Sequence, residues 1–363
     1  MKVGRIEMTE LEIPFRYVFK HAAAERKYTQ SLWVVVHSED GIVGYGESCP
    51  REYVTAETIH SAKNAFREIE RELFDMDWDI DILKKWVAQH KTFIDNHPAA
   101  WCAIELALLD ALAKTKDQTI EGVLGALEIR GDFFYTAILG DSSTDLFSQL
   151  LTKYLSMNMT DFKLKLSGDQ AKDQRRIEMI SEACSGNCLI RVDGNNVFRN
   201  SEQAVAYCRP FSDYIFAIEE PIKAKSYAQL LEIAKQLDVK IILDESFTVA
   251  EDFNALSSQE SPWIINVRVS KLGGLLRSLD IVRFARQQHI PVIVGAHVGE
   301  TSLLTRAALS VASQARDILL AQEGAFGDYF LETDVCENSL RFGMGGCIHS
   351  EMLNRSGYGL GVL

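Results

Sequence analysis

The sequence has little that would mark a membrane, nucleotide-binding or nucleic-acid-binding protein. None of its apolar runs approaches the ~18 residues that a membrane span needs. No glycine-rich dinucleotide fingerprint follows a strand-like run, and there is no Walker sequence. The net charge of −13 argues against nucleic acid or an anionic membrane as the main partner. An anionic small molecule is not excluded, because the local field of a site can oppose the net charge.

Disulfides and a secretory segment are also not indicated. The seven cysteines are odd in number and scattered, at positions 49, 102, 184, 188, 208, 336 and 347. Cys184 and Cys188 have the spacing of a metal clip, but no second pair or histidine lies near them in the sequence, so we expect no zinc there. Residues 1–5 lead directly into a strand-like segment without a signal peptide. We therefore expect a cytoplasmic protein with reduced cysteines.

The length of the chain and a change of hydrophobic period predict two structural parts. At 363 residues the chain is too long for one small core. Residues 1–60 read as strands and turns, and residues 55–125 carry apolar residues at helical spacing, so we predict an α+β domain over 1–125. Residues 99–113 are apolar almost all round, which is typical of a helix buried between layers.

A second rhythm begins near residue 133. Short apolar runs recur there, separated by amphipathic helical segments, at 133–139, 161–166, 188–193, 214–219, 239–244, 263–269, 291–296 and 317–323. Strands that alternate with helices in this way predict an α/β protein with a TIM-type barrel over residues 126–335. The turn-rich C-terminal segment, residues 336–363, is expected to pack on the N-terminal domain.

Acidic residues close three successive runs of the predicted barrel. Asp193, Glu219 and Asp244 end the third, fourth and fifth runs, with spacings of 26 and 25 residues that correspond to one βα unit each. Barrel chemistry belongs at the carboxyl ends of the strands, so these carboxylates should lie at the same height. They would repel one another without a cation, and hard oxygen ligands suit Mg²⁺, with Mn²⁺ next. The alternative is that each acid caps the helix that follows it.

Lysines are predicted on either side of these acids. Lys163 and Lys165 alternate with apolar residues in the second run and therefore point to the same side of a strand. Lys271 follows the sixth run, across the barrel from the second. A neighbouring cation disfavours the ammonium form of a lysine, so Lys163 and a metal are expected to favour the neutral amine of Lys165 that a general base requires. Ion pairing with surface acids is the alternative for each lysine.

Seven short segments, in this order, resemble the enolase superfamily in its muconate-lactonizing-enzyme subgroup. They are Gly41-Ile-Val-Gly-Tyr-Gly-Glu47, Pro50-Arg-Glu-Tyr-Val-Thr-Ala-Glu57, Lys163-Leu-Lys165, Asp193-Gly-Asn195, Glu219-Glu-Pro221, Asp244-Glu-Ser246 and Lys271-Leu-Gly-Gly274. The resemblance covers essentially the whole chain. It implies a (β/α)7β-like barrel with an N-terminal α+β capping domain that the C-terminal tail completes. It also implies a Mg²⁺-dependent enzyme that removes the proton next to a carboxylate and forms an enediolate, a chemistry known for this superfamily.

The resemblance also implies roles for individual residues. Three acids would be metal ligands: Asp193, Glu219 and Asp244. Two lysines would act as acid and base on opposite faces of the substrate, Lys165 and Lys271, with Lys163 as the carboxylate-binding neighbour. Asn195 and Glu245 would hold ligands and lysines in place. The mandelate-racemase branch uses a His–Asp pair instead, but Ser270-Lys271 stands at the sixth strand here, which implies the lysine branch. His297 is then either a substrate contact or a core histidine.

Substrate specificity is expected from two loops of the first domain, near residues 15–30 and 50–55, and from the last strand ends. The candidate contacts in the loops are basic or aromatic: Arg16, His21, Arg26, Tyr28, Arg51 and Tyr53. Ordinary packing is the alternative for each of them. We predict that Arg26 and Tyr53 of this group, together with His297 and Glu323, contact the substrate.

The eighth run decides between reactions. Dipeptide epimerases of this subgroup typically carry Asp-x-Asp there, to hold the substrate's ammonium group, whereas this chain has Glu323-Gly-Ala-Phe-Gly327, which resembles the cycloisomerases more. We therefore predict a cycloisomerase first, a racemase or epimerase of dipeptides or N-acyl amino acids second, and a dehydrating synthase third. From another class, a non-catalytic barrel that binds a metal–carboxylate complex is kept as an alternative. The expected partners are a small carboxylate and further copies of the chain in a homo-oligomer.

Overall fold

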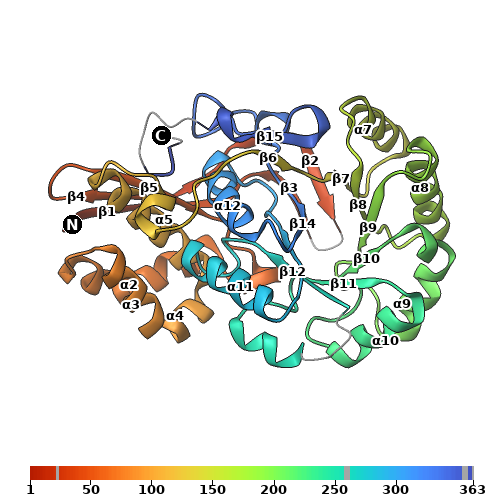
Figure 1. Cartoon of the computed structure of the whole chain (residues 1–363), viewed down its shortest axis with the longest axis horizontal. Helices are drawn as coiled ribbons and strands as arrows, with labels where there is room; N and C mark the ends of the chain where they lie inside the picture. The colour runs from red at the N-terminus through yellow and green to blue at the C-terminus, as the bar shows by residue number, and fades with distance from the viewer. Residues whose placement is uncertain (22–23, 257–261, 354–358, 362–363) are drawn as a thin grey trace.

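The computed structural model describes residues 1–363 except 22–23, 257–261, 354–358 and 362–363. Figure 1 shows the N-terminal strands and helices on one side of the molecule and a curled parallel sheet with its helices on the other. The hairpin of β2 (Pro14–His21) and β3 (Ala24–Tyr28) reaches from the first part toward the second. A bridge between Phe15 and Leu331 ties this hairpin to the segment that follows the last barrel strand.

The capping domain is an antiparallel sheet covered by one buried helix. Its strands have the order β1 (Val3–Leu11), β4 (Ser31–Ser38) and β5 (Val43–Ser48). Helix α5 (Pro98–Thr115) packs on this sheet and is buried on nearly all sides, as predicted. Gly44 and Gly46 of β5 allow this close approach, because a side chain on either would collide with the α5 backbone. The other helices of this part are α1 (Glu52–Thr55), α2 (Ile59–Asp75), α3 (Ile80–Gln89), α4 (Lys91–Asn96) and α6 (Ile120–Leu124).

The barrel domain is an eight-stranded parallel sheet with the strand order β14-β13-β12-β11-β10-β9-β8-β7. In chain order the strands are β7 (Ala137–Leu139), β8 (Asp161–Lys165), β9 (Leu189–Asp193), β10 (Ala217–Glu219), β11 (Lys240–Leu243), β12 (Trp263–Val267), β13 (Val292–Val294) and β14 (Leu319–Gln322). The connecting helices are α7 (Thr144–Ser156), α8 (Gln170–Ala183), α9 (Ser201–Cys208) with the 3-10 helix η1 (Arg209–Tyr214), α10 (Tyr227–Leu237), η2 (Ala250–Ala255), α11 (Leu275–Gln287) and α12 (Ser302–Ala315). This arrangement confirms the (β/α)7β-like barrel with a capping domain.

Two predicted strands differ in the structure. The run 133–139 contains two short strands with different partners: β6 (Asp132–Phe134) pairs antiparallel with β15 (Cys347–His349), and only β7 joins the barrel sheet. The run 214–219 becomes a strand only at Ala217, since η1 occupies its first residue.

The C-terminal tail contacts both parts of the molecule. Through β15 it pairs with β6, and the Tyr135 amide donates to the Gly346 carbonyl oxygen at 2.8 Å. Farther along, the amide of Leu360 donates to the Asp110 carboxylate of α5 at 2.7 Å. The remaining short elements after β14 are the 3-10 helices η3 (Gly327–Tyr329), η4 (Met344–Gly346) and η5 (Ser350–Met352).

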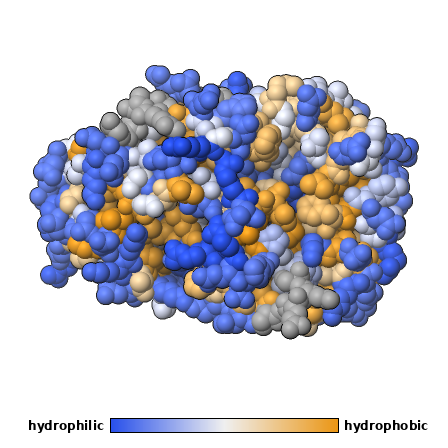
Figure 2. Space-filling model, viewed as in Figure 1, coloured by the Kyte–Doolittle hydropathy of each residue, from blue (hydrophilic) through white to orange (hydrophobic). Residues whose placement is uncertain are grey.

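The outer surface is mixed in character. Hydrophilic and hydrophobic residues are interspersed over the face shown in Figure 2. Within the described part of the chain, no helix is both long enough and apolar enough to span a bilayer.

Candidate active site

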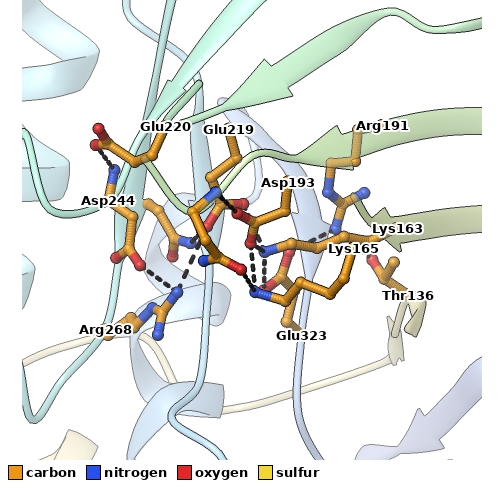
Figure 3. Close-up of polar contacts among 12 residues, drawn as sticks. Thr136, Lys163, Lys165, Arg191, Asp193, Glu219, Glu220, Asp244, Arg268 and Glu323 are labelled. Carbon is orange, nitrogen blue, oxygen red and sulfur yellow. Dashed lines mark hydrogen bonds and ion pairs between the residues drawn. The ribbon is translucent and has the colours of Figure 1, made fainter. Parts of the chain in front are cut away.

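Strand register brings the three predicted metal ligands together. Asp193 ends β9 and is paired with Glu219 at the end of β10, so the two carboxylates stand side by side. Asp244 directly follows β11, two residues beyond Ile242, which is the register partner of Glu219. Because alternate residues of a strand share a face, Asp244 lies on the same side as Glu219. All three side chains are at most 2% exposed, and Figure 3 shows them converging from neighbouring strands.

Lys163 and Lys165 approach these acids from β8. Lys165 is the register partner of Asp193, and its Nζ lies 2.5 Å from Asp193 Oδ2 and 3.3 Å from Asn195 Oδ1. The Nζ of Lys163 lies 2.5 Å from Glu219 Oε2 and 3.1 Å from Asp193 Oδ2 (Figure 3). Burial disfavours the charged form of Lys163, but the surrounding carboxylates more than offset this and hold its pKa above the usual value.

Lys271 reaches the same group of acids from the opposite side. It follows β12, which is separated from β8 by the three strands that carry the acids. Its buried Nζ donates to Asp244 Oδ1 at 3.0 Å and to the backbone carbonyl oxygens of Asp244 and Asn266 at 2.8 and 2.6 Å. Lys165 and Lys271 therefore flank the acids, as the sequence predicts. To reach a substrate, Lys271 has to release some of these carbonyl contacts.

Two arginines, which the sequence analysis did not single out, complete the ionic network. Arg268 forms an ion pair with Asp244 and lies 3.5 Å from Glu219 Oε1. Arg191 lies within β9 and donates to Glu323 Oε1 at 2.9 Å. The available signal was a basic residue inside each of two mainly apolar runs, 188–193 and 263–269. A buried charge is costly unless it is paired, so such a residue indicates an ionic partner inside the barrel.

Glu323 lies deep in this network. Its Oε2 is 3.1 Å from Lys163 Nζ, and its other oxygen accepts from Arg191. Burial raises the pKa of a carboxyl group, but Lys163 and Arg191 more than reverse this and hold the pKa of Glu323 at about 2. Its carboxylate is therefore ionised and already bound by two cations of the chain.

The loops after the strands are held by side chains beside the acids. Glu220 accepts hydrogen bonds from the amides of Asp244 and Ser246, both at 2.7 Å, which fixes the turn after β11. Asn195 donates its amide to Asp193 Oδ1 at 3.0 Å and accepts from Lys165 through its side chain. Asn195 thus bridges an acid and a lysine, in the position that the resemblance implies.

The donor set fits a hard divalent cation. Burial raises the pKa of Glu219 to about 7, and burial with the charge of Asp244 raises the pKa of Glu245 to about 8. Glu245 Oε2 and Asn266 Oδ1 are buried oxygens without a hydrogen-bond partner among the described residues. Crowded carboxylates and unsatisfied oxygens are what an oxygen-preferring cation such as Mg²⁺ would relieve. Asp193, Glu219 and Asp244 are the residues that would hold it.

A cavity of about 410 Å³ opens above these groups. Its polar floor includes Lys163, Lys165, Asn195, Asp244, Glu245 and Arg268. Its walls are largely apolar and aromatic, with Tyr17, Val18 and Tyr53 from the capping domain and Leu146, Tyr154, Phe326, Phe330 and Leu331 from the barrel side. A cavity with a charged floor and apolar walls suits a carboxylate that carries an apolar substituent.

The predicted loop contacts divide into two groups. Tyr53 lines the cavity, and the Arg26 guanidinium lies 5.9 Å from the centre of its ring. Arg51 and Arg16 instead donate to backbone carbonyl oxygens, Arg51 to four of them, and these contacts match the packing alternative. Tyr28 is half exposed. The side chain of His21 lies outside the described part of the structure.

His297 lies in the cavity wall just after β13. It is 3% exposed, and neither ring nitrogen has a hydrogen-bond partner among the described residues. Its backbone amide donates to Glu300 Oε1 at 2.6 Å, which fixes the turn. Burial and the nearby guanidinium of Arg268 hold the pKa of His297 well below its usual value, so the ring is neutral. The Nδ1 atom lies 3.6 Å from Glu300 Oε1, just beyond hydrogen-bond distance. Unsatisfied buried polar atoms are rare, and Nε2 therefore indicates a partner that the described residues do not supply.

Two family models match the chain over most of its length. Residues 6–125 match the N-terminal domain of mandelate racemase / muconate lactonizing enzyme. Residues 147–362 match the enolase C-terminal domain-like model. These boundaries separate the antiparallel capping region from the barrel and include the tail with the barrel.

Individual proteins are similar to the chain at low identity. The hydrophobic dipeptide epimerase of Enterococcus faecalis is 23% identical over 90% of this chain and 92% of its own length. The N-succinyl-L-Arg/Lys racemase of Bacillus cereus is 24% identical over 86% of this chain and 84% of its own. Among solved structures, muconate lactonizing enzyme from Klebsiella pneumoniae superposes with a TM-score of 0.83 at 24% identity, covering 99% of this chain and 96% of the other.

These comparisons reverse the predicted order of reactions. The two relatives carry names that describe inversion at a carbon centre, whereas the likeness to muconate lactonizing enzyme, at its low identity, shows the fold alone. They support the racemase or epimerase alternative better than the cycloisomerase that the eighth run of the sequence favours.

Proposed function

The chain belongs to the mandelate racemase and muconate lactonizing enzyme family of the enolase superfamily and is an isomerase, and we propose that it inverts the α-carbon of an N-acyl amino acid or a dipeptide. The observation that carries the proposal is the placement of Lys165 and Lys271 on either side of the carboxylates of Asp193, Glu219 and Asp244. Inversion requires a proton donor and a proton acceptor on opposite faces of one carbon.

The proposed reaction exchanges one proton for another. The neutral amine of Lys165 takes the α-proton from one face, and the electron pair of the C–H bond passes into the substrate carboxylate as an enediolate forms. The ammonium group of Lys271 then gives a proton to the opposite face, and the carboxylate is restored. In the reverse direction the two lysines exchange roles, so neither atoms nor charge are gained or lost.

The main contribution to the activation barrier of this reaction is the negative charge that develops on the substrate carboxylate oxygens. Lys163 and Arg268 are buried cations at the cavity floor and would stabilise that charge where it develops. A bound Mg²⁺ would supply Lewis-acid stabilisation of the same charge. Enzymes of this family are typically Mg²⁺-dependent, and the donor set described above fits this ion.

The cavity favours an N-acyl amino acid with an apolar side chain over a dipeptide. A dipeptide brings a free ammonium group that needs a carboxylate, but Glu323 at the end of β14 is already bound by Lys163 and Arg191. A neutral amide needs only a hydrogen-bond partner, which His297 offers through Nε2. Tyr53, Phe326 and the other apolar wall residues suit a hydrophobic side chain.

Exchange of the α-proton with solvent deuterium tests this function. Both enantiomers of N-acetylphenylalanine, N-acetylleucine and N-succinylarginine, with Leu-Tyr as the dipeptide arm, are incubated with Mg²⁺ in D₂O and followed by NMR and polarimetry. The wild-type protein is expected to invert and exchange at least one N-acyl pair. Lys165→Ala and Lys271→Ala should each abolish inversion, and each should retain exchange with one enantiomer at most, in a complementary pattern.

A surface lysine provides the control for these variants. Lys235→Ala, on the exposed side of α10, should behave as wild type. Exchange of the same enantiomer in both active-site variants, or exchange that never appears with Mg²⁺ across the panel, contradicts the two-lysine reaction. The second outcome would return the non-catalytic barrel to consideration.

Cycloisomerisation is the second candidate. It rests on the segment Glu323-Gly-Ala-Phe-Gly327, which resembles the cycloisomerases and of which Phe326 lines the cavity. Loss of muconate absorbance in the ultraviolet, in the presence of Mg²⁺ and dependent on Lys165, would favour this reaction over inversion.

A further inference from the structure

The C-terminal tail and the start of the barrel place three metal-ligating side chains on one face of a small ribbon. In the antiparallel pair of β6 and β15, His349 stands directly opposite Asp132. Cys347 lies two residues before His349 on the same strand and so points to the same face. These three side chains lie outside the cavity described above and have no part in the proposed reaction.

The donor atoms are already close enough for one ion. Cys347 Sγ lies 3.7 Å from His349 Nδ1, and the same nitrogen lies 2.7 Å from Asp132 Oδ1. One ligand atom from each residue lies within 4.8 Å of the others. Tetrahedral zinc with bonds of ~2.3 Å to sulfur and ~2.0 Å to nitrogen separates those two atoms by about 3.5 Å. The His349–Asp132 contact of 2.7 Å has to lengthen to admit the ion.

We propose that Asp132, Cys347 and His349 form a binding site for a single transition-metal ion, with Zn²⁺ as the expected occupant and water as the remaining ligand. The ligand types select this ion, because a thiolate and an imidazole favour Zn²⁺ over the Mg²⁺ expected at the all-oxygen site in the barrel. Among the described residues, these three form the one group of histidine, cysteine and acidic side chains whose ligand atoms all lie within 4.8 Å of one another.

The surroundings make the site accessible and sensitive to pH. The side chains of His349 and Asp132 are 57% and 50% exposed, whereas Cys347 is buried, so an ion enters from solvent and meets the sulfur last. Burial and the negative charge of Asp132 raise the pKa of the Cys347 thiol. A bound ion must displace that proton, and its affinity therefore falls as the pH is lowered.

One cation of the chain lies at the same corner. The Arg316 guanidinium donates to the backbone carbonyl oxygens of Arg130 and Asp132 and stacks over Phe133. Arg316 therefore binds carbonyl oxygens, whereas the Asp132 carboxylate is hydrogen-bonded to His349. The positive charge of Arg316 weakens metal binding, and replacing it with a neutral residue should raise the affinity.

A metal at this position would fasten the tail to the barrel. The Gln322 side chain at the end of β14 donates to the Phe134 carbonyl oxygen of β6, and the Thr136 amide donates to the Gln322 carbonyl oxygen. The ribbon therefore lies where the first and last barrel strands, β7 and β14, approach each other. An ion that joins β15 to β6 stabilises this closure and resists detachment of the tail.

Cobalt titration of the full-length, metal-stripped protein tests the site, with Mg²⁺ at saturating concentration to fill the oxygen site. A thiolate bound to Co²⁺ gives a charge-transfer band in the near ultraviolet that carboxylate ligands do not give. We expect this band to saturate at one equivalent and to be displaced by Zn²⁺. We also expect Zn²⁺ to raise the melting temperature of the wild-type protein.

Variants identify the ligands. Cys347→Ser and His349→Ala should abolish the band, and Asp132→Asn should weaken Co²⁺ binding at least tenfold. Cys188→Ser is the matched control, because Cys184 and Cys188 are the other pair of soft ligands close in sequence, and it should keep the band. Arg316→Gln should tighten binding. Melting in EDTA verifies that each variant is folded, and His349 is exposed enough for substitution to be tolerated.

The result that overturns the proposal is a protein that gives no thiolate band with Co²⁺, or a band that survives both Cys347→Ser and His349→Ala. The deuterium-exchange assay is independent of this site. A negative cobalt titration therefore does not affect the proposed isomerase function. A negative deuterium-exchange assay likewise does not affect the proposed metal site.

Discussion

Replacing Lys163 by methionine should lower the melting temperature of the barrel. The size of the decrease depends on the contacts that Lys163 makes. The side chain is 1% exposed, and its ammonium group contacts Glu219, Asp193 and Glu323. Methionine keeps the apolar stem but leaves these buried carboxylates without a shared cation. Removing one partner of a buried ion pair costs ~3–5 kcal/mol, because the remaining charge is uncompensated.

The expected shift in melting temperature follows from the size of the protein. An unfolding entropy of ~2.1 cal/mol/K per residue gives about 0.8 kcal/mol per kelvin for the chain, so the loss corresponds to a decrease of roughly 4–6 °C. The loss should be smaller near pH 5 than at pH 8, because the carboxylates can then take up protons in place of the ammonium group. Mg²⁺ should restore part of the loss, since a divalent cation compensates the same charges.

Differential scanning calorimetry in EDTA and in Mg²⁺ measures both effects. Lys165→Met is the matched control, because Lys165 points to the same side of β8 but is 12% exposed and has one carboxylate contact among the described ion pairs. Its melting temperature should change by less than half as much. Equal melting temperatures for wild type and Lys163→Met in EDTA would refute the view that Lys163 holds the buried acids together.

Two further predictions concern the cavity and the domain contact. His297→Phe should raise KM for an N-acyl substrate about 10- to 100-fold with a smaller change in kcat, because a lost hydrogen bond in a buried site is worth ~1–3 kcal/mol. An unchanged KM would contradict a substrate contact of His297. Burial raises the pKa of Glu105 to about 7, from 4.5, so this group's contribution to stability is present below about pH 4.5 and is lost as the pH rises through 7. That loss is at most ~3 kcal/mol. The Glu105 carboxylate accepts a hydrogen bond from the Leu276 amide at the start of α11, and Glu105→Gln should keep this contact. The variant should reduce the difference in stability between pH 5 and pH 8, measured by urea unfolding. An unchanged pH dependence would exclude Glu105 as its source.

Features that depend on local periodicity could be predicted from the amino-acid sequence. The eight apolar runs, the acids at three successive strand ends and the two lysines two residues apart in β8 follow from the alternation of a strand and the length of a βα unit. These rules act within ~30 residues, so the sequence predicted that Lys165 and Lys271 would flank Asp193, Glu219 and Asp244.

Contacts between segments that are distant in the sequence could not be predicted in this way. Arg191 and Arg268 are basic residues in mainly apolar runs, and their partners are set by strand register and barrel curvature, which no local pattern encodes. That the ring nitrogens of His297 lack hydrogen bonds among the described residues became visible only when its surroundings were known. The run 133–139 divided because residues more than 200 positions away pair with its first half, and that pairing brought Cys347 and His349 to Asp132. Burial and long-range pairing depend on the whole fold, and for this reason the ionic network and the second metal site appear only in three dimensions.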